Sequence, residues 1–145
     1  MSVRNFSKII CAALLLVVCF CGASMAAENK YPIDKWLDAQ IKKAAGNDPA
    51  MAEAVYIAGE KWDAELNKYY KIVMGKLDAA GQAKLKESQR AWLKFRDAEL
   101  SAAEAVTDVF ESGGTMQRLD LNDRRMSLIR ARTIDLMEYS RQLSN

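Results

Sequence analysis

The chain has 145 residues, half of them apolar, with only 7 glycines and 2 prolines. This length allows one domain, and the scarcity of glycine and proline favours helices over a turn-rich β-sandwich. The formal charge of +2 falls to zero without Arg4 and Lys8 near the N-terminus, so the rest of the chain has no overall attraction to nucleic acid or anionic lipid.

Residues 1–26 have the pattern of a secretory signal peptide. Arg4 and Lys8 form a positive start, an apolar run follows, and Ala23-Ser24-Met25-Ala26 offers small residues for cleavage after Ala26. The apolar run of about 12–13 residues is shorter than the roughly 20 that span a bilayer. We therefore expect a periplasmic or secreted mature domain of residues 27–145, without stable membrane insertion; an uncleaved anchor is the alternative.

All three cysteines, Cys11, Cys19 and Cys21, fall inside this leader, and the chain has no histidine. Cys19 and Cys21 each follow a large residue, which disfavours a lipid anchor. The mature domain is expected to lack a disulfide, a thiol nucleophile, a metal site and a cofactor. Without histidine it also lacks the usual general base near neutral pH, so we predict that it is not an enzyme.

The first two helices are predicted from start signals and apolar spacing. Pro32 opens a helix to about residue 45, and Gly46-Asn47 ends it. Asp48 is predicted to cap the second helix, with Pro49 in its first turn. An apolar stripe with helical spacing then marks the buried face: Met51, Val55, Ala58, Trp62, Leu66, Tyr69, Val73 and Leu77.

Two further helices complete the predicted fold. Asp78 is expected to cap a helix over residues 79–111, Gly113-Gly114 to end it, and Thr115 to cap the last helix. The expected core side of the third helix comprises Leu85, Trp92, Phe95, Ala102, Val106 and Val109 or Phe110. That of the fourth comprises Met116, Leu119, Met126, Ile129, Thr133, Leu136 and Leu143. Short connections between long helices predict an all-α fold, an elongated antiparallel three-helix bundle with a short extra N-terminal helix.

The densest candidate for binding is residues 85–99. Helical spacing places Ser88, Gln89, Trp92, Arg96 and Glu99 within one side of a helix, and aromatic residues with arginine are typical of binding hot spots. The alternative is structural: Trp92 and Phe95 belong to the core, and Arg96 forms an ion pair with a neighbouring helix.

Charged residues in the other helices admit both a functional and a structural interpretation. Gly113-Gly114 before a helix, with the arginines at 124, 125, 130 and 132, could hold an anion. A plain turn and a solvated or internally paired face are the alternative, because Asp120, Asp123 and Asp135 are interleaved with the arginines. Asp63 and Glu65 are predicted to meet arginines of other helices. The carboxylate pairs Glu60 with Asp63 and Asp120 with Asp123 fall on faces predicted to be solvated, which disfavours acid–base catalysis.

Several motifs together resemble the LprI-like lysozyme-inhibitor family, over about residues 31 to 140. The motifs are Trp62-Asp63-Ala64-Glu65-Leu66-Asn67, Leu77-Asp78, Leu85-Lys86, Ser88-Gln89-Arg90-Ala91-Trp92, Phe95-Arg96-Asp97-Ala98-Glu99, Gly114-Thr115-Met116, and Arg130-Ala131-Arg132 with Leu136. Many members carry cysteines near the positions held here by Gln40, Ala54, Leu100 and Arg124, so any disulfide-stapled surface of those relatives is absent.

The resemblance implies a small exported helical domain that binds a protein partner, c-type lysozyme, and blocks its cleft. Our first hypothesis is a non-enzymatic binding protein in which the carboxylates of Asp97 and Glu99 face the basic enzyme, flanked by Gln89, Trp92 and Arg96. The second is a structural or scaffold protein of the cell envelope that acts through a helix face.

Overall fold

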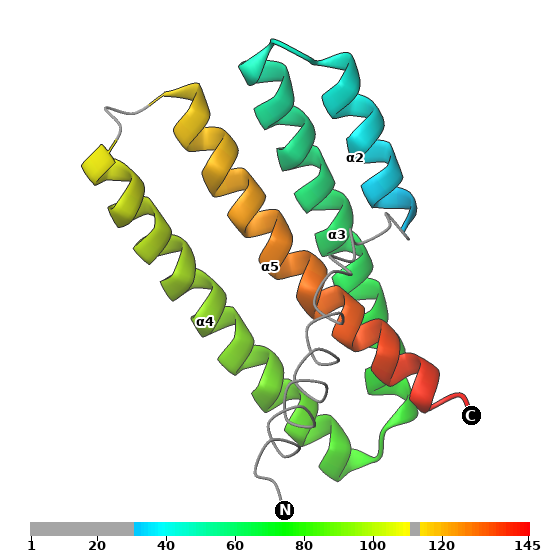
Figure 1. Ribbon diagram of the computed structural model, residues 1–145. Helices are drawn as coiled ribbons and strands as arrows, with labels where there is room; N and C mark the ends of the chain where they lie inside the picture. Colours follow the sequence, from blue (N-terminus) through cyan, green and yellow to red (C-terminus); the bar gives the residue numbers. More distant parts are fainter. Residues whose placement is uncertain (1–30, 111–113) are drawn as a thin grey trace, which may run out of the picture. The chain divides into compact units, whose positions relative to one another are not determined.

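A computed structural model describes residues 31–110 and 114–145 of the chain, which form four α-helices and no strand (Figure 1). The helices are α2 (Pro32–Lys43), α3 (Asp48–Lys76), α4 (Ala79–Phe110) and α5 (Thr115–Gln142). The all-helical prediction is confirmed for these residues. The predicted signal peptide, its cleavage after Ala26 and the three cysteines lie outside the described residues.

Helices α3 and α5 form the centre of the fold and run in the same direction, with the longest shared interface (Figure 1). The residue numbers of contacting pairs rise along both helices, as expected of parallel neighbours. The Ala52 carbonyl accepts from Asn122, and the Trp62 carbonyl accepts from Thr133. Helix α2 packs on α3, and α4 runs back along α5 with few contacts to α3. The finer prediction of a three-helix bundle is therefore not confirmed, because α4 packs mainly on α5 and contacts α3 little.

The core lies mainly between α3 and α5, with one residue from α4. Its buried members are Val55, Ala58, Trp62, Leu66, Val73, Leu85, Met126, Ile129 and Leu136. The stripe predicted on α3 is confirmed at five of these positions, and that on α5 at three. Predicted Thr133 is also fully buried, and its hydroxyl donates to the Ile129 carbonyl.

The helix starts follow the sequence signals with two corrections. Asp78 caps α4 as predicted, since its Oδ1 accepts from the Gly81 N–H at 2.8 Å. Asp48 does not cap α3: the cap is Asn47, whose Oδ1 accepts from the Ala50 N–H at 3.0 Å. Thr115 is the first residue of α5 rather than its cap, because the extended Gly114 precedes it.

The predicted core side of α4 is wrong over its second half. The side chains of Phe95, Val106 and Val109 are 54%, 59% and 76% exposed, and Ala102 is exposed as well. The physical reason is that α4 buries only a narrow side, represented by Leu85 and the half-buried Trp92. Near the two ends of α5, Met116 and Leu143 are also exposed, against the prediction.

Among the residues that the structure describes, none of the helices is both long and apolar enough to span a membrane.

Candidate functional site

Three of the five predicted binding residues, Gln89, Trp92 and Arg96, line one groove between α3 and α4. The same groove is lined by Asp63, Leu66, Asn67 and Tyr70 of α3 and by Lys86, Arg90 and Leu93 of α4. We call it the α3–α4 groove. Residues from two helices therefore form the surface around the motif at residues 85–99.

Arg96 links the aromatic and acidic parts of this motif. Its guanidinium lies 5.4 Å from the centre of the Trp92 ring and donates to Asp97 Oδ1 from Nε at 2.9 Å and from Nη2 at 2.7 Å. The Asp97 side chain remains 64% exposed. The structural alternative for this segment fails in two respects, because Phe95 is exposed and Arg96 pairs within its own helix.

Gln89 attaches α4 to α5. Its Oε1 accepts from Arg132 Nε at 3.0 Å, and the neighbouring Ser88 Oγ accepts from Arg132 Nη2 at 3.1 Å. Arg132 is buried. Because its carbonyl oxygen is engaged inside the fold, Gln89 orients the motif rather than presenting that oxygen to a partner.

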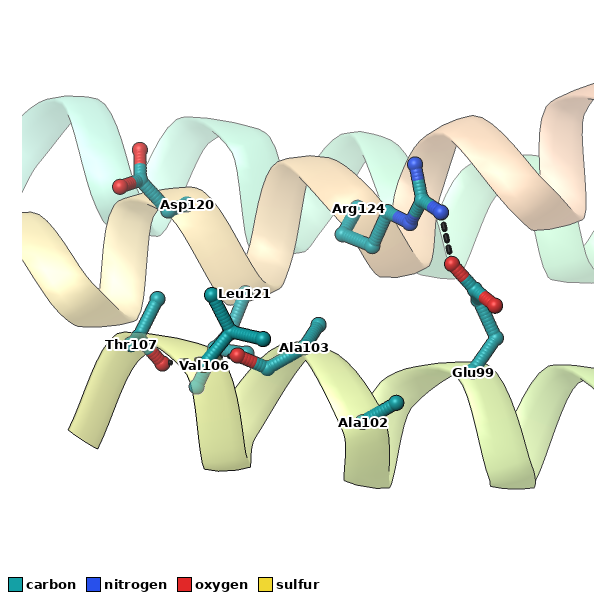
Figure 2. Close-up of a pocket in the computed structure, with 8 residues that line it drawn as sticks. All are labelled: Glu99, Ala102, Ala103, Val106, Thr107, Asp120, Leu121 and Arg124. Atoms are coloured by element: carbon teal, nitrogen blue, oxygen red, sulfur yellow. Dashed lines mark hydrogen bonds and ion pairs between the residues drawn. The ribbon is translucent and has the colours of Figure 1, made fainter. Parts of the chain in front are cut away.

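Glu99 lies on a different side of α4 from Asp97. It accepts from Arg124 of α5 at one end of a groove between α4 and α5, into which Leu121 projects (Figure 2). We call this the α4–α5 hollow; it is further lined by Ala102, Ala103, Val106, Thr107 and Asp120. The structure thus does not bring all five predicted residues into one site.

Asp97 instead lines another groove, beside α5, together with Glu104. Sequence reasoning did not identify Glu104 as a site residue. The other residues that line this groove are Leu100, Ser101, Leu121, Asn122 and Arg125. Arg125 Nη2 also donates to Glu60 Oε1 of α3 at 2.9 Å. Two carboxylates, those of Asp97 and Glu104, therefore line one groove with an arginine that is paired to a third carboxylate, that of Glu60. We call this the acidic groove.

The charges of α4 are separated along its length. Residues 97–110, the acidic half, carry Asp97, Glu99, Glu104 and Asp108 and no basic residue; residues 79–96 carry Lys84, Lys86, Arg90, Lys94 and Arg96 but only Glu87 as an acid. This order opposes the helix dipole, which favours acids near the N-terminus and bases near the C-terminus. Helix stability therefore does not explain the arrangement.

Three of the four α5 arginines in the predicted anion site are paired internally with carboxylates, and the fourth, Arg132, donates to Gln89 and Ser88. Arg124 contacts Glu99, Arg125 contacts Glu60, and Arg130 contacts Asp34. Their partners come from three other helices rather than from the interleaved aspartates of α5. The predicted anion site at Gly113-Gly114 includes a residue outside the described part of the chain, and these pairings leave it without support.

The prediction that Asp63 and Glu65 meet arginines of other helices is wrong. Asp63 Oδ2 accepts from Asn67 at 3.0 Å, and Glu65 pairs with Lys68 at 2.9 Å, both within α3. Their positions explain this, since residues three or four apart on a helix are neighbours.

The carboxylates of the described residues form no metal site, and one of them has a perturbed pKa. Within residues 31–110 and 114–145 there is no cluster of three acidic, histidine or cysteine residues that could hold a metal ion. In the pair Asp120 and Asp123, partial burial, and secondarily the charge of Asp120, raise the pKa of the Asp123 carboxyl above its ordinary value.

The chain is similar to one known family and to one curated relative. A family model described as lysozyme inhibitor LprI matches residues 39–136. An uncharacterized protein of Rhizobium meliloti (strain 1021) is 34% identical over 97 residues, which cover 57% of this chain and 66% of the relative. The match thus covers slightly less than two thirds of that relative's length. No solved structure matches the chain.

Proposed function

Because the chain belongs to the LprI lysozyme inhibitor family, we propose that it is an exported, non-enzymatic protein that binds c-type lysozyme and blocks its cleft. The domain of residues 27–145 would act in the periplasm or outside the cell after removal of the leader near Ala26. The partner is a protein, and no cofactor, metal or nucleic acid takes part.

The observation that carries the proposal is the charge order of α4. A lysozyme of the c type is a basic protein, and complementary potentials steer and orient such partners. The acidic half of α4 has four carboxylates and no cation. Arg125, the cation that lines the acidic groove, is itself paired with Glu60 of α3, which offsets its positive charge.

Within this surface we assign Asp97 and Glu104 to direct contact with the enzyme. Both are exposed and line the same groove. Arg96 and Trp92 fix the position of Asp97 from one side, and Gln89 holds that stretch of α4 on α5. Glu99 has a supporting part, because its carboxylate is paired with Arg124.

The proposal is tested by adding the purified protein to c-type lysozyme and following lysis of a cell-wall suspension. We expect lysis to slow as the protein approaches molar excess. The double variant Asp97→Lys with Glu104→Lys should inhibit at least about tenfold less well, equivalent to about 1.4 kcal/mol of binding. Glu87→Lys is the control: it reverses one carboxylate on α4 outside the acidic groove, which is half the charge change of the double variant.

Salt provides a second readout. If carboxylates steer the encounter, the association rate should fall as ionic strength rises, and the double variant should lose most of that dependence. Full lysis at large molar excess of the wild-type protein would end the proposal. Equal inhibition by the double variant and the wild type would remove Asp97 and Glu104 from the contact.

The second candidate is a structural protein of the cell envelope that acts through a helix face. The exposed apolar side chains of Phe95, Val106 and Val109 favour a protein contact on α4. A protein with this role alone would leave the rate of lysis unchanged at every ratio, so the same assay separates the two functions.

A further inference from the structure

The exposed side of α4 has a heptad repeat, of which the packing of the domain uses only Ser88, whose hydroxyl accepts from Arg132. Spacings of three and four residues alternate along a row of exposed side chains: Ser88, Ala91, Phe95, Ala98, Ala102, Ala105 and Val109. We call this row the α4 seam. Such a 3.5-residue period is the pattern of helices that pair along a common axis.

We propose that two copies of the chain pair through their α4 seams, side by side and antiparallel. The two-fold axis crosses the seam between Ala98 and Ala102, at the level of Leu100 along the helix. The seam includes a phenylalanine that is 54% exposed and a valine that is 76% exposed, and pairing removes both from water. The row from Ser88 to Val109 is about 30 Å long at 1.5 Å per residue.

Charge complementarity selects the antiparallel arrangement. Lys94 and Asp108 flank the seam on the same edge, six residues before and eight residues after Leu100. In an antiparallel pair that edge meets its own copy, so Lys94 of each chain lies near Asp108 of the other. A parallel pair would instead set this edge against the opposite edge of the partner helix, so the contact between Lys94 and Asp108 would not form.

Shape complementarity points independently to the same axis. With the axis near Leu100, Phe95 of one copy lies opposite Ala105 of the other, beside the α4–α5 hollow. That hollow is lined by Ala102, Ala103 and Val106 (Figure 2). An exposed aromatic ring and an apolar depression therefore meet at matching positions, as expected of a self-complementary two-fold interface.

The seam and the acidic groove occupy different sides of α4. Asp97 and Glu104 fall outside the heptad positions and face the groove that includes Arg125. The pairing consequently leaves the surface proposed to bind lysozyme open in both copies, and the inference does not depend on that proposed function.

The test measures the mass of the protein, expressed from its full chain, by sedimentation equilibrium over a range of concentrations. We expect a dimer for the wild type and a dissociation constant at least about tenfold higher for Lys94→Glu, for Asp108→Lys and for Phe95→Glu. The double variant Lys94→Glu with Asp108→Lys reverses the pair and should recover the dimer. Lys86→Glu, on α4 but off the seam, should keep the wild-type mass.

Circular dichroism of each variant shows whether the helices are retained. A folded wild type that remains monomeric at all concentrations would overturn the proposal. So would a double variant that associates no better than the single variants, because the Lys94–Asp108 register requires mutual rescue.

Discussion

Asp34 of α2 and Arg130 of α5 are joined by a two-point ion pair, with Nε–Oδ1 at 2.9 Å and Nη2–Oδ2 at 2.7 Å. The Asp34 side chain is only 9% exposed. The same guanidinium lies 5.4 Å from the Tyr31 ring centre and 5.5 Å from that of Trp62. One arginine therefore holds the N-terminal helix against the centre of the fold.

Replacing Arg130 with methionine should lower the free energy of unfolding by about 2–4 kcal/mol, because it leaves a buried carboxylate without its partner. Denaturant unfolding followed by circular dichroism measures the change. Arg141→Met is the control, since the Arg141–Glu138 pair is exposed and its loss should change little. Equal unfolding midpoints for the two variants would contradict the assigned role of Arg130. Adding Asp34→Leu to Arg130→Met should restore part of the loss.

Trp62 is 1% exposed, and its indole Nε1 has no hydrogen-bond partner in the described part of the chain. Trp62→Ala should therefore destabilise the protein by about 3–5 kcal/mol through the cavity that it leaves. Trp62→Phe should cost clearly less, because phenylalanine keeps much of the apolar area and removes an unsatisfied buried donor. Thermal unfolding of both variants provides the comparison. An equally large loss of stability for both would refute the assigned role of the Trp62 ring in filling the core.

Two glycines inside α3 differ in their surroundings. A Cβ at Gly75 would meet nothing within 4 Å, whereas at Gly59 it would lie 3.4 Å from Arg125 Nη1 and 3.7 Å from Met126 Cβ. Gly75→Ala should stabilise the protein by about 0.5–1 kcal/mol, the helix preference of alanine over glycine.

Gly59→Ala should give the same gain or less, since its contacts are at ordinary van der Waals distance. Gly59→Leu should be destabilising, because a larger side chain would push α5 away from α3. Denaturation midpoints for the three variants measure these differences. A stabilising leucine would show that the helices are not closely packed at this point.

The raised pKa of Asp123 predicts a pH-dependent effect of its removal. An acid whose folded pKa lies above its unfolded value destabilises the fold while it is charged, and this penalty disappears as pH falls through the folded pKa. Asp123→Asn should thus raise the melting temperature at pH 7, with a smaller gain in acid. Asp135→Asn, at another exposed position of the same helix, is the control; a gain for Asp123→Asn that is independent of pH would oppose this explanation.

The sequence predicts α3 better than α4 because α3 has a single apolar side. Residues such as Val55, Trp62 and Val73 share one stripe, and all are buried. In α4, Leu85 and Trp92 mark the side that packs on the domain, while Phe95 and Val109 belong to the exposed seam. Both rows are apolar with similar periods, so periodicity alone cannot separate the core side from the outward one.

The candidate site was predictable only within one helix. The motif containing Trp92, Arg96 and Asp97 is contiguous, so its local geometry follows from helical spacing. Glu60 and Arg125 are 65 residues apart in sequence and meet through the packing of α3 on α5. That meeting, and the addition of Glu104 to the groove, depends on the relative rotation of the helices.

Helix α5 contacts each of the other three helices through a different arginine: Arg130 reaches α2, Arg125 reaches α3, and Arg124 reaches α4. It is also synthesised after the three helices that it contacts. A nascent chain that stops before it has neither the principal partner of α3 nor the support along which α4 lies. Assembly of this domain must therefore wait until α5 has been synthesised, and a premature stop codon ahead of α5 should yield a polypeptide that proteases remove.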